Sequence, residues 1–132
     1  MSIHKKNNQE IVFSVLCKAS KPMTAYQILE KLKRYGINAP PTVYRALEAL
    51  QAQGQVHRIE SVNAFVVCHQ HEHISHPASF ILCSDCGEVK EIHDDRMEIL
   101  LKEWAERFHF SVKQQTIELL GLCLQCKQQG KL

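Results

Sequence analysis

Two pairs of cysteines with the spacing C-x-x-C carry the clearest chemical signal in the chain. Cys83 and Cys86, followed by Gly87, form the first pair, and Cys123 and Cys126 form the second pair after an interval of 36 residues. A C-x-x-C turn can direct both sulfur atoms toward one point, and a glycine eases the tight turn. Four thiolates at the corners of a tetrahedron are a ligand set of structural Zn²⁺. The sequence therefore predicts a structural zinc site at these four cysteines.

Thiol redox chemistry is the alternative use of these cysteines. The chain has six cysteines and eight histidines, and clustered cysteines in a reducing compartment usually bind metal or do redox chemistry. A thioredoxin-type pair needs a C-x-x-C at the start of a helix in a βαβ unit, and the pattern indicates none. A CxxC oxidoreductase is kept as an alternative of another class, together with unligated cysteines. The sequence has no nucleophile–base motif and no phosphate loop, so we do not expect an enzyme.

The elements around the cysteines must hold the two pairs together. Short apolar runs predict strands at 80–82, 89–92 and roughly 112–120, with a helix from about 95 to 108 between the last two. Three short strands and one helix bury little surface by themselves. We therefore expect metal and a second copy of the chain to complete this half. The apolar stripe of the helix consists of Met97, Leu100, Leu101, Trp104 and Phe108.

The first half predicts three helices followed by a β-hairpin, which is the order of a winged helix. The second helix opens at a capping box of Thr24 and Gln27, and prolines at 40–41 open the third. We interpret Cys17 as a small buried residue of the first helix. The expected bounds are 7–19 for the first helix, 24–36 and 40–54 for the next two, and 55–59 and 64–68 for the hairpin strands.

Charge and hydropathy restrict the classes of partner and compartment. Residues 1–62 carry nine basic and four acidic side chains, a net charge of +5, whereas residues 63–132 carry seven and ten, a net charge of −3. A basic half beside an acidic half favours a polyanionic partner for the first half. The chain has no run of 18 apolar residues and no signal-peptide pattern. We therefore expect a cytoplasmic protein that does not bind a membrane.

A second group of metal-competent residues is looser in its spacing. A mixed nitrogen, sulfur and oxygen set suits Zn²⁺ better than Mn²⁺. Spacing alone does not select the ligands, because three nearby histidines compete and a solvated histidine-rich loop explains them equally well. The residues in question are His57, Cys68, His76 and Glu91, with His69, His71 and His73 as competitors.

Four motifs together resemble the Fur (ferric uptake regulator) family. They are PPTVYRAL at 40–47, VHRIES at 56–61, CSDCG at 83–87 and GLCLQC at 121–126. The resemblance extends from the first helix to Cys126, and within the family it is strongest to the zinc uptake regulators. It implies an α+β fold with an N-terminal winged helix-turn-helix and a small C-terminal α/β dimerisation domain with a three-stranded sheet and zinc-binding knuckles. The implied domain bounds are 1–67 for DNA binding, 68–78 for a histidine-rich hinge and 79–132 for dimerisation and zinc binding.

The resemblance also implies a function and two zinc ions per monomer. It predicts a zinc-responsive repressor of zinc uptake genes, which binds double-stranded operator DNA as a homodimer and has no small-molecule substrate. A zinc ion held by both His57 and Glu91 would fix the angle between the domains and place two reading helices roughly 34–36 Å apart. By motif, the structural ligands are Cys83, Cys86, Cys123 and Cys126, and the regulatory ligands are His57, Cys68, His76 and Glu91.

The third helix is the expected reader of DNA. Arg45 suits bidentate contact with guanine, and Tyr44 suits contact with a base face or a phosphate. Thr42, Lys5 and Lys6 are expected to grip phosphates and to make the affinity depend on salt.

Departures from the iron-sensing pattern leave rival sensors open. Iron regulators carry an H-H-D-H cluster and a later histidine, whereas this chain has HQHEH at 69–73 and Gln115. The alternatives are a Fur-family regulator of iron, manganese or peroxide, and a DNA-binding module with structural zinc and no sensing. His71, His73 and His93 are without an assigned role, either as a third metal site or as solvated side chains.

Overall fold

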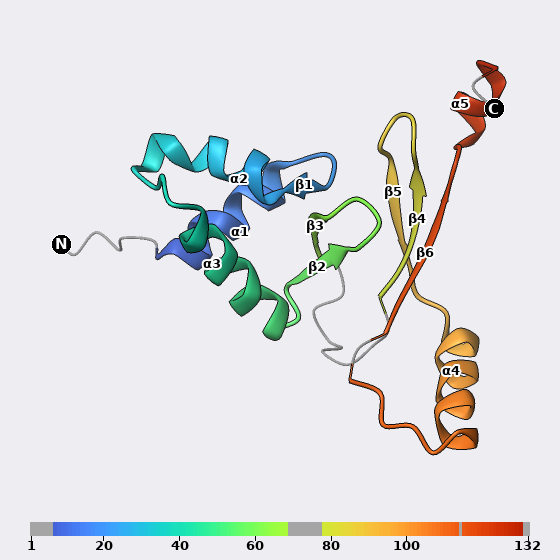
Figure 1. Cartoon of the computed structure of the whole chain (residues 1–132). Coiled ribbons are helices and arrows are strands. Elements are labelled where there is room, and N and C mark those ends of the chain that lie inside the picture. Colours follow the sequence, from blue (N-terminus) through green and yellow to red (C-terminus); the bar gives the residue numbers. More distant parts are fainter. Residues whose placement is uncertain (1–6, 69–77, 114, 131–132) are drawn as a thin grey trace. The chain divides into compact units, whose positions relative to one another are not determined.

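The computed structural model describes residues 7–68, 78–113 and 115–130, and the chain forms two compact units, 1–74 and 75–132 (Figure 1). No helix in these described ranges is long and apolar enough to cross a membrane. Most of the expected hinge lies outside the described residues, as do six residues whose roles were discussed above, namely Lys5, Lys6, His69, His71, His73 and His76.

Three helices build the N-terminal unit, as predicted. They are α1 (Asn8–Lys18), α2 (Ala25–Leu32) and α3 (Pro40–Ala52). The capping box of α2 is confirmed: the amide of Gln27 donates to Thr24 Oγ1 at 3.2 Å, and the amide of Thr24 donates to Gln27 Oε1 at 2.9 Å. A short 3₁₀ turn, η1 (Lys33–Tyr35), extends α2 and ends at Gly36, whose φ of 80° suits glycine.

One apolar core joins these helices to the hairpin. Each helix turns an apolar face into this core, where Val12, Leu32 and Leu47 are almost completely buried. The prediction for Cys17 is wrong, since this thiol is exposed. Leu16 occupies the buried position, and one residue further the helix has turned by about 100° away from the core.

The predicted hairpin consists of β2 (Val56–Ile59) and β3 (Ala64–Val67), which pair antiparallel. Asn63 adopts a left-handed φ of 49° at the turn, a conformation that asparagine tolerates better than most residues. A two-residue strand, β1 (Met23–Thr24), adds to the other edge of β3 and was not predicted. The unit is therefore a winged helix with a three-stranded sheet in the order β1-β3-β2.

The C-terminal unit contains the predicted three-stranded sheet. Its strands are β4 (Ala78–Cys83), β5 (Val89–Ile92) and β6 (Thr116–Gly121), in the order β5-β4-β6. The central strand β4 runs antiparallel to β5 and parallel to β6, and α4 (Asp95–Arg107) lies in the connection between β5 and β6 (Figure 1). The α+β class is confirmed.

The third strand begins later than predicted, at residue 116 instead of roughly 112. The end of α4 explains the delay: His109 has a φ of 52° and the amide of Phe110 donates to the carbonyl of Ala105 at 2.8 Å. This pattern is the Schellman ending of a helix, and it places residues 108–110 in the end of α4. A further helix, α5 (Leu124–Gln128), was not predicted.

No other described part of the chain buries the apolar stripe of α4. None of the residues of α4 is buried, and Trp104 is 50% exposed while Phe108 is 72% exposed. Sheet residues such as Leu119 and Leu120 are also exposed. Contiguous apolar surface of this kind marks a protein interface, which agrees with the expectation of a second copy.

Candidate metal centre and nucleic-acid interface

Parallel pairing of β4 with β6 brings the two C-x-x-C pairs together. Cys83, the last residue of β4, lies opposite Gly121, the last residue of β6. The amide of Ser84 donates to the carbonyl of Gly121 at 2.8 Å and ties the two strand ends to each other. Cys123 follows two residues after Gly121, so both C-x-x-C pairs start at the C-terminal ends of these two neighbouring strands. The interval of 36 residues is thus closed by neighbouring strands.

The four sulfur atoms form a compact cluster, with every pair within 4.8 Å. The Sγ atoms of Cys86 and Cys123 are 3.9 Å apart. A tetrahedron with zinc–sulfur bonds of 2.3 Å has edges of about 3.8 Å. Cys83 and Cys126 are buried, and the other two cysteines are half-buried. The donor set, its spacing and its seclusion fit a closed structural zinc site.

Backbone amides tune the thiol of Cys83. The amides of Cys123 and Cys86 donate to Cys83 Sγ at 3.4 and 3.5 Å, and together they lower the pKa of this thiol to about 6. Hydrogen bonds to the charged form favour the thiolate, which is the form that binds metal. The predicted turn is confirmed as well, because Gly87 has a φ of 79° and its amide donates to the carbonyl of Cys83 at 3.0 Å.

Burial has the opposite effect at the other end of the cluster. Desolvation, followed by contact with the neighbouring thiols, raises the pKa of Cys126. A buried thiolate there needs a positive charge beside it, and a coordinated dication supplies that charge and deprotonates the thiol.

His57 and Cys68 form a second candidate pair inside the N-terminal unit. The first is on β2, the second directly follows β3, and their ligand atoms lie within 4.8 Å of each other. The amide of Cys68 donates to the carbonyl of Gln55 at 2.9 Å, which continues the ladder of the hairpin and places Cys68 beside His57. An imidazole nitrogen and a buried thiol at this separation are a pair of borderline-soft donors that suits zinc.

The other two expected regulatory ligands do not belong to the described part of the N-terminal unit. Glu91 lies on β5 of the C-terminal unit, where its Oε1 is 3.4 Å from His93 Nε2. His76 is outside the described residues.

The outer face of α3 presents the residues expected to read DNA. Tyr44 and Arg45 are exposed, Thr42 is half-buried, and Val43 and Leu47 point into the core. Arg58 on β2 is a further basic side chain that the sequence reasoning did not assign. Its Nε and Nη2 donate to Asn63 Oδ1 at 3.1 and 2.8 Å, so the turn residue positions this guanidinium on the wing.

The fold and the donor sets define a winged-helix protein with a thiolate metal site on a separate α/β unit. The model of the ferric uptake regulator family matches residues 5–120, and the chain belongs to this family. The chain is 38% identical over 105 residues to the zinc uptake regulation protein of Escherichia coli (strain K12), an alignment that covers 79% of this chain and 61% of that protein. The chain thus spans about six-tenths of the length of this relative.

Two solved structures of zinc uptake regulators are similar over almost the whole chain. One is a zinc uptake regulator complexed with zinc and DNA, at 31% identity and a TM-score of 0.88, with 98% of this chain and 87% of that chain covered. The other is holo XcZur, at 36% identity and a TM-score of 0.84, with 97% and 89% covered.

Proposed function

We propose that the chain is a zinc-responsive transcriptional repressor, which binds double-stranded operator DNA as a zinc-loaded homodimer and controls zinc uptake genes. The observation that carries the proposal is the pair of His57 and Cys68, because these metal donors lie on the wing of the unit that holds the exposed residues of α3. The similarity to a zinc uptake regulator that was solved with zinc and DNA supports the same function. We expect no enzymatic activity.

Each protomer holds two zinc ions in this proposal. The structural ion takes the four thiolates of the C-terminal unit. The regulatory ion takes His57 and Cys68, with His76 and Glu91 as the remaining ligands. Because Glu91 belongs to the other unit, a shared ion restricts the angle between the units and favours the DNA-binding arrangement. Coupling between two sites is typically about 1–3 kcal/mol, and DNA then tightens zinc binding by the same factor.

The DNA contacts follow from the exposed side chains of α3. In the proposal this helix enters the major groove, Arg45 binds a guanine edge, and Tyr44 contacts a base face or a phosphate. Thr42, Lys5 and Lys6 bind phosphates. The homodimer forms over the exposed apolar surface of α4 and the sheet, and each protomer presents its α3 to one of two successive major grooves.

The sensing role is tested by Cys68→Ser, with Cys17→Ser as the matched control, since Cys17 is an exposed cysteine outside both donor groups. Fluorescence anisotropy with a zinc-uptake promoter fragment is recorded across buffered free zinc. We expect Cys68→Ser to lose about 5- to 150-fold in zinc-dependent affinity and to retain one zinc per protomer, whereas the control retains two and binds normally.

Other outcomes separate the rivals. Unchanged DNA binding by Cys68→Ser would contradict sensing and indicate a constitutive zinc-stapled module. Equal activation of the wild type by iron or manganese would indicate a different sensor, and a protein that contains no zinc would favour the oxidoreductase alternative.

The reading role is tested by Arg45→Ala. Loss of one bidentate guanine contact costs about 1–3 kcal/mol of discrimination, so we expect specific binding to approach the affinity for random DNA while zinc content is unchanged. Operator affinity that survives this substitution would contradict the assignment.

A further inference from the structure

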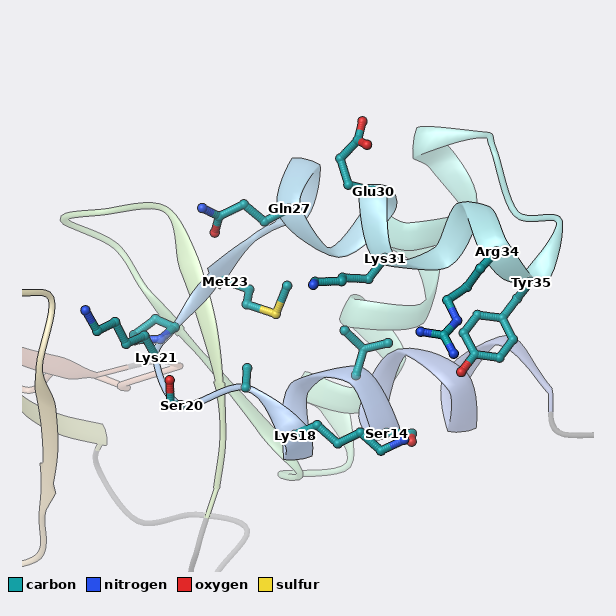
Figure 2. A pocket seen from close by; sticks show the side chains of 13 residues that line it. Ser14, Lys18, Ser20, Lys21, Met23, Gln27, Glu30, Lys31, Arg34 and Tyr35 are labelled. Atoms are coloured by element: carbon teal, nitrogen blue, oxygen red, sulfur yellow. The ribbon is translucent and has the colours of Figure 1, made fainter.

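A cavity of about 700 Å³ lies between α1 and α2 in the N-terminal unit (Figure 2). Its walls come from the last turns of α1, the segment that leads into β1, the outer face of α2 and η1. No residue of α3 lines it. Small-molecule sites typically measure about 300–1,000 Å³, so the cavity has the size of a site for a small organic ligand.

The rim of this cavity is strongly basic. Lys18 comes from α1, Lys21 from the following segment, and Lys31 and Arg34 from α2 and η1. Within the described part of the chain, none of the three lysines forms an ion pair. The single carboxylate of the lining is Glu30, and Lys33 outside the cavity binds it at 2.8 Å. The cations therefore exceed the local anions and attract a negatively charged ligand.

The floor and one end of the cavity are apolar or aromatic. Val15, Ala19 and the buried Met23 contribute aliphatic and thioether surface, and a thioether adapts to ligands of different shape. At the end, the guanidinium carbon of Arg34 lies 5.4 Å from the centroid of the Tyr35 ring, which positions this guanidinium in advance. The lining thus combines an apolar bed with several cations at its edge.

The location of the cavity argues against the DNA backbone as its occupant. Leu16 and Ile28 belong to the core cluster that α1 and α2 share with α3, whereas the basic rim of the cavity comes from exposed positions outside α3. Figure 2 shows Lys31 on α2 and Lys18 on α1 among the side chains that line this cavity. A ligand there would bridge the two helices on the side away from the exposed face of α3.

We infer that this cavity binds a small organic anion, one that joins an apolar or aromatic body to a carboxylate, sulfonate or phosphate. The apolar body rests on the floor formed by Val15 and Met23, and the anionic group meets Lys18, Lys31 and Arg34. This site is additional to the proposed metal-dependent function. It does not depend on that function, since none of its residues belongs to a candidate metal centre or to α3.

The test uses naphthalene-2-sulfonate as the probe and follows the amide signals of the zinc-loaded full chain by NMR. We expect saturable shifts confined to residues 14–35. Two further probes separate the components of the site: naphthalene-2-sulfonamide has the same body without the charge, and inorganic sulfate has the charge without the body. We expect each to bind at least about tenfold more weakly, a difference of about 1.4 kcal/mol.

Variants on exposed positions avoid a loss of folding. Lys31→Glu reverses one rim charge and is expected to weaken the sulfonate about tenfold or more, while Glu30→Gln removes the opposing carboxylate and tightens it. Lys102→Glu, an exposed lysine on α4 of the other unit, is the matched control and leaves the affinity unchanged.

Four results would overturn the inference. They are equal binding of the sulfonamide, equal binding of sulfate, shifts that map to α3 or to the C-terminal unit, and displacement of the probe by operator DNA. The last result would assign these cations to the DNA backbone. Because the readout requires neither zinc-dependent DNA binding nor repression, failure here leaves the proposed function untouched, and failure of that function leaves this site standing.

Discussion

The two units of the chain are held together in different ways. Among the described residues, twenty apolar or cysteine side chains are buried. Sixteen of them belong to the N-terminal unit, and most of these form one contiguous cluster from Val12 to Phe65. In the described part of the C-terminal unit, the corresponding residues are Phe80, Leu82, Cys83 and Cys126. Half of that short set are sulfur donors of the candidate zinc site, so we expect metal ligation to replace much of the missing apolar core.

The two units therefore differ in the source of their stability. Small domains bury a small share of their surface, and many of them rely on a disulfide, a metal or a partner for stability. The winged helix meets this limit with a core that all three helices and the hairpin share. The α/β unit instead exposes the apolar face of α4 and sheet residues such as Leu119, and we propose that zinc and a second copy supply the missing stability.

Removal of zinc is expected to have the largest effect, because it should unfold one unit and leave the other folded. Structural zinc contributes about 10–16 kcal/mol of apparent binding free energy in small zinc-dependent domains. Chelation, or Cys83→Ser, is therefore expected to unfold residues 75–132 while α1–α3 remain folded. Amide NMR of the two units measures this directly: the dispersion of the C-terminal signals collapses and that of the N-terminal signals persists. Cys17→Ser, with full zinc content, is the control.

The same experiment can break the comparison. If the metal-free C-terminal unit kept its amide dispersion, its sheet and α4 would be stable by packing alone, and the four thiols would have a role other than stapling the fold.

Truncation of a buried side chain in the N-terminal core is expected to destabilise this unit and leave the C-terminal unit unchanged. Leu47 is 1% exposed and packs within the shared cluster. Leu47→Ala is expected to cost about 2–5 kcal/mol of unfolding free energy, with no change in the zinc bound by the four cysteines. Denaturant unfolding followed by helical signal measures the loss. A large fall in structural zinc content would show that the units do not fold independently.

The apolar face of α4 is tested by Trp104→Asp. Half of this indole is exposed in the single chain, and buried tryptophans at interfaces often contribute 2 kcal/mol or more. We expect a shift from dimer to monomer in sedimentation at micromolar concentration. Lys102→Asp is the matched control, since residue 102 lies two positions away and therefore on the opposite side of the helix. A dimer that survives Trp104→Asp would place the contact elsewhere.

Sequence reasoning succeeded where a periodic pattern was long enough to read. The three helices and the hairpin of the winged helix follow from helical spacing, the Thr24 capping box and turn residues. It failed where elements are too short to have a period: β1 has two residues, and α5 has five and begins at Leu124, directly after Cys123. Cys17 was misplaced because an apolar residue type was given more weight than its angle on the helix.

The candidate sites divide in the same manner. The four cysteines were grouped by chemistry alone, but the parallel pairing of β4 with β6 that closes the cluster could not be deduced, because strand patterns do not give strand order. The proximity of His57 and Cys68 depends on the register of the hairpin, which spacing leaves open. The basic cavity could not be predicted from the sequence, since its lysines come from separate segments.

The helix caps give the finest comparison, because α2 opens on a neutral hydroxyl and α4 opens on a charge. Asp94 caps α4 by accepting from the amide of Arg96 at 2.9 Å, and the Arg96 side chain, which donates to the same carboxylate, lowers the pKa of Asp94 to about 2. An unperturbed aspartate has a pKa of about 3.9. A folded-state pKa below this value means that the contribution of the charge is complete above about pH 4 and is lost as the pH falls toward 2.

The expected effect is small, because the pair is exposed to solvent and salt screens it. Carbon-13 NMR of the Asp94 carboxyl, recorded while the α4 amides remain dispersed, should show an ionised group at pH 3. Arg96→Gln should move the midpoint toward 3.9 and leave the cap in place. A wild-type midpoint near 3.9 with α4 still folded would rule out the ion pair. If α4 loses its amide dispersion in acid, the midpoint reports the unfolded chain and not the ion pair, as is expected where acid protonates the thiolates and releases the metal.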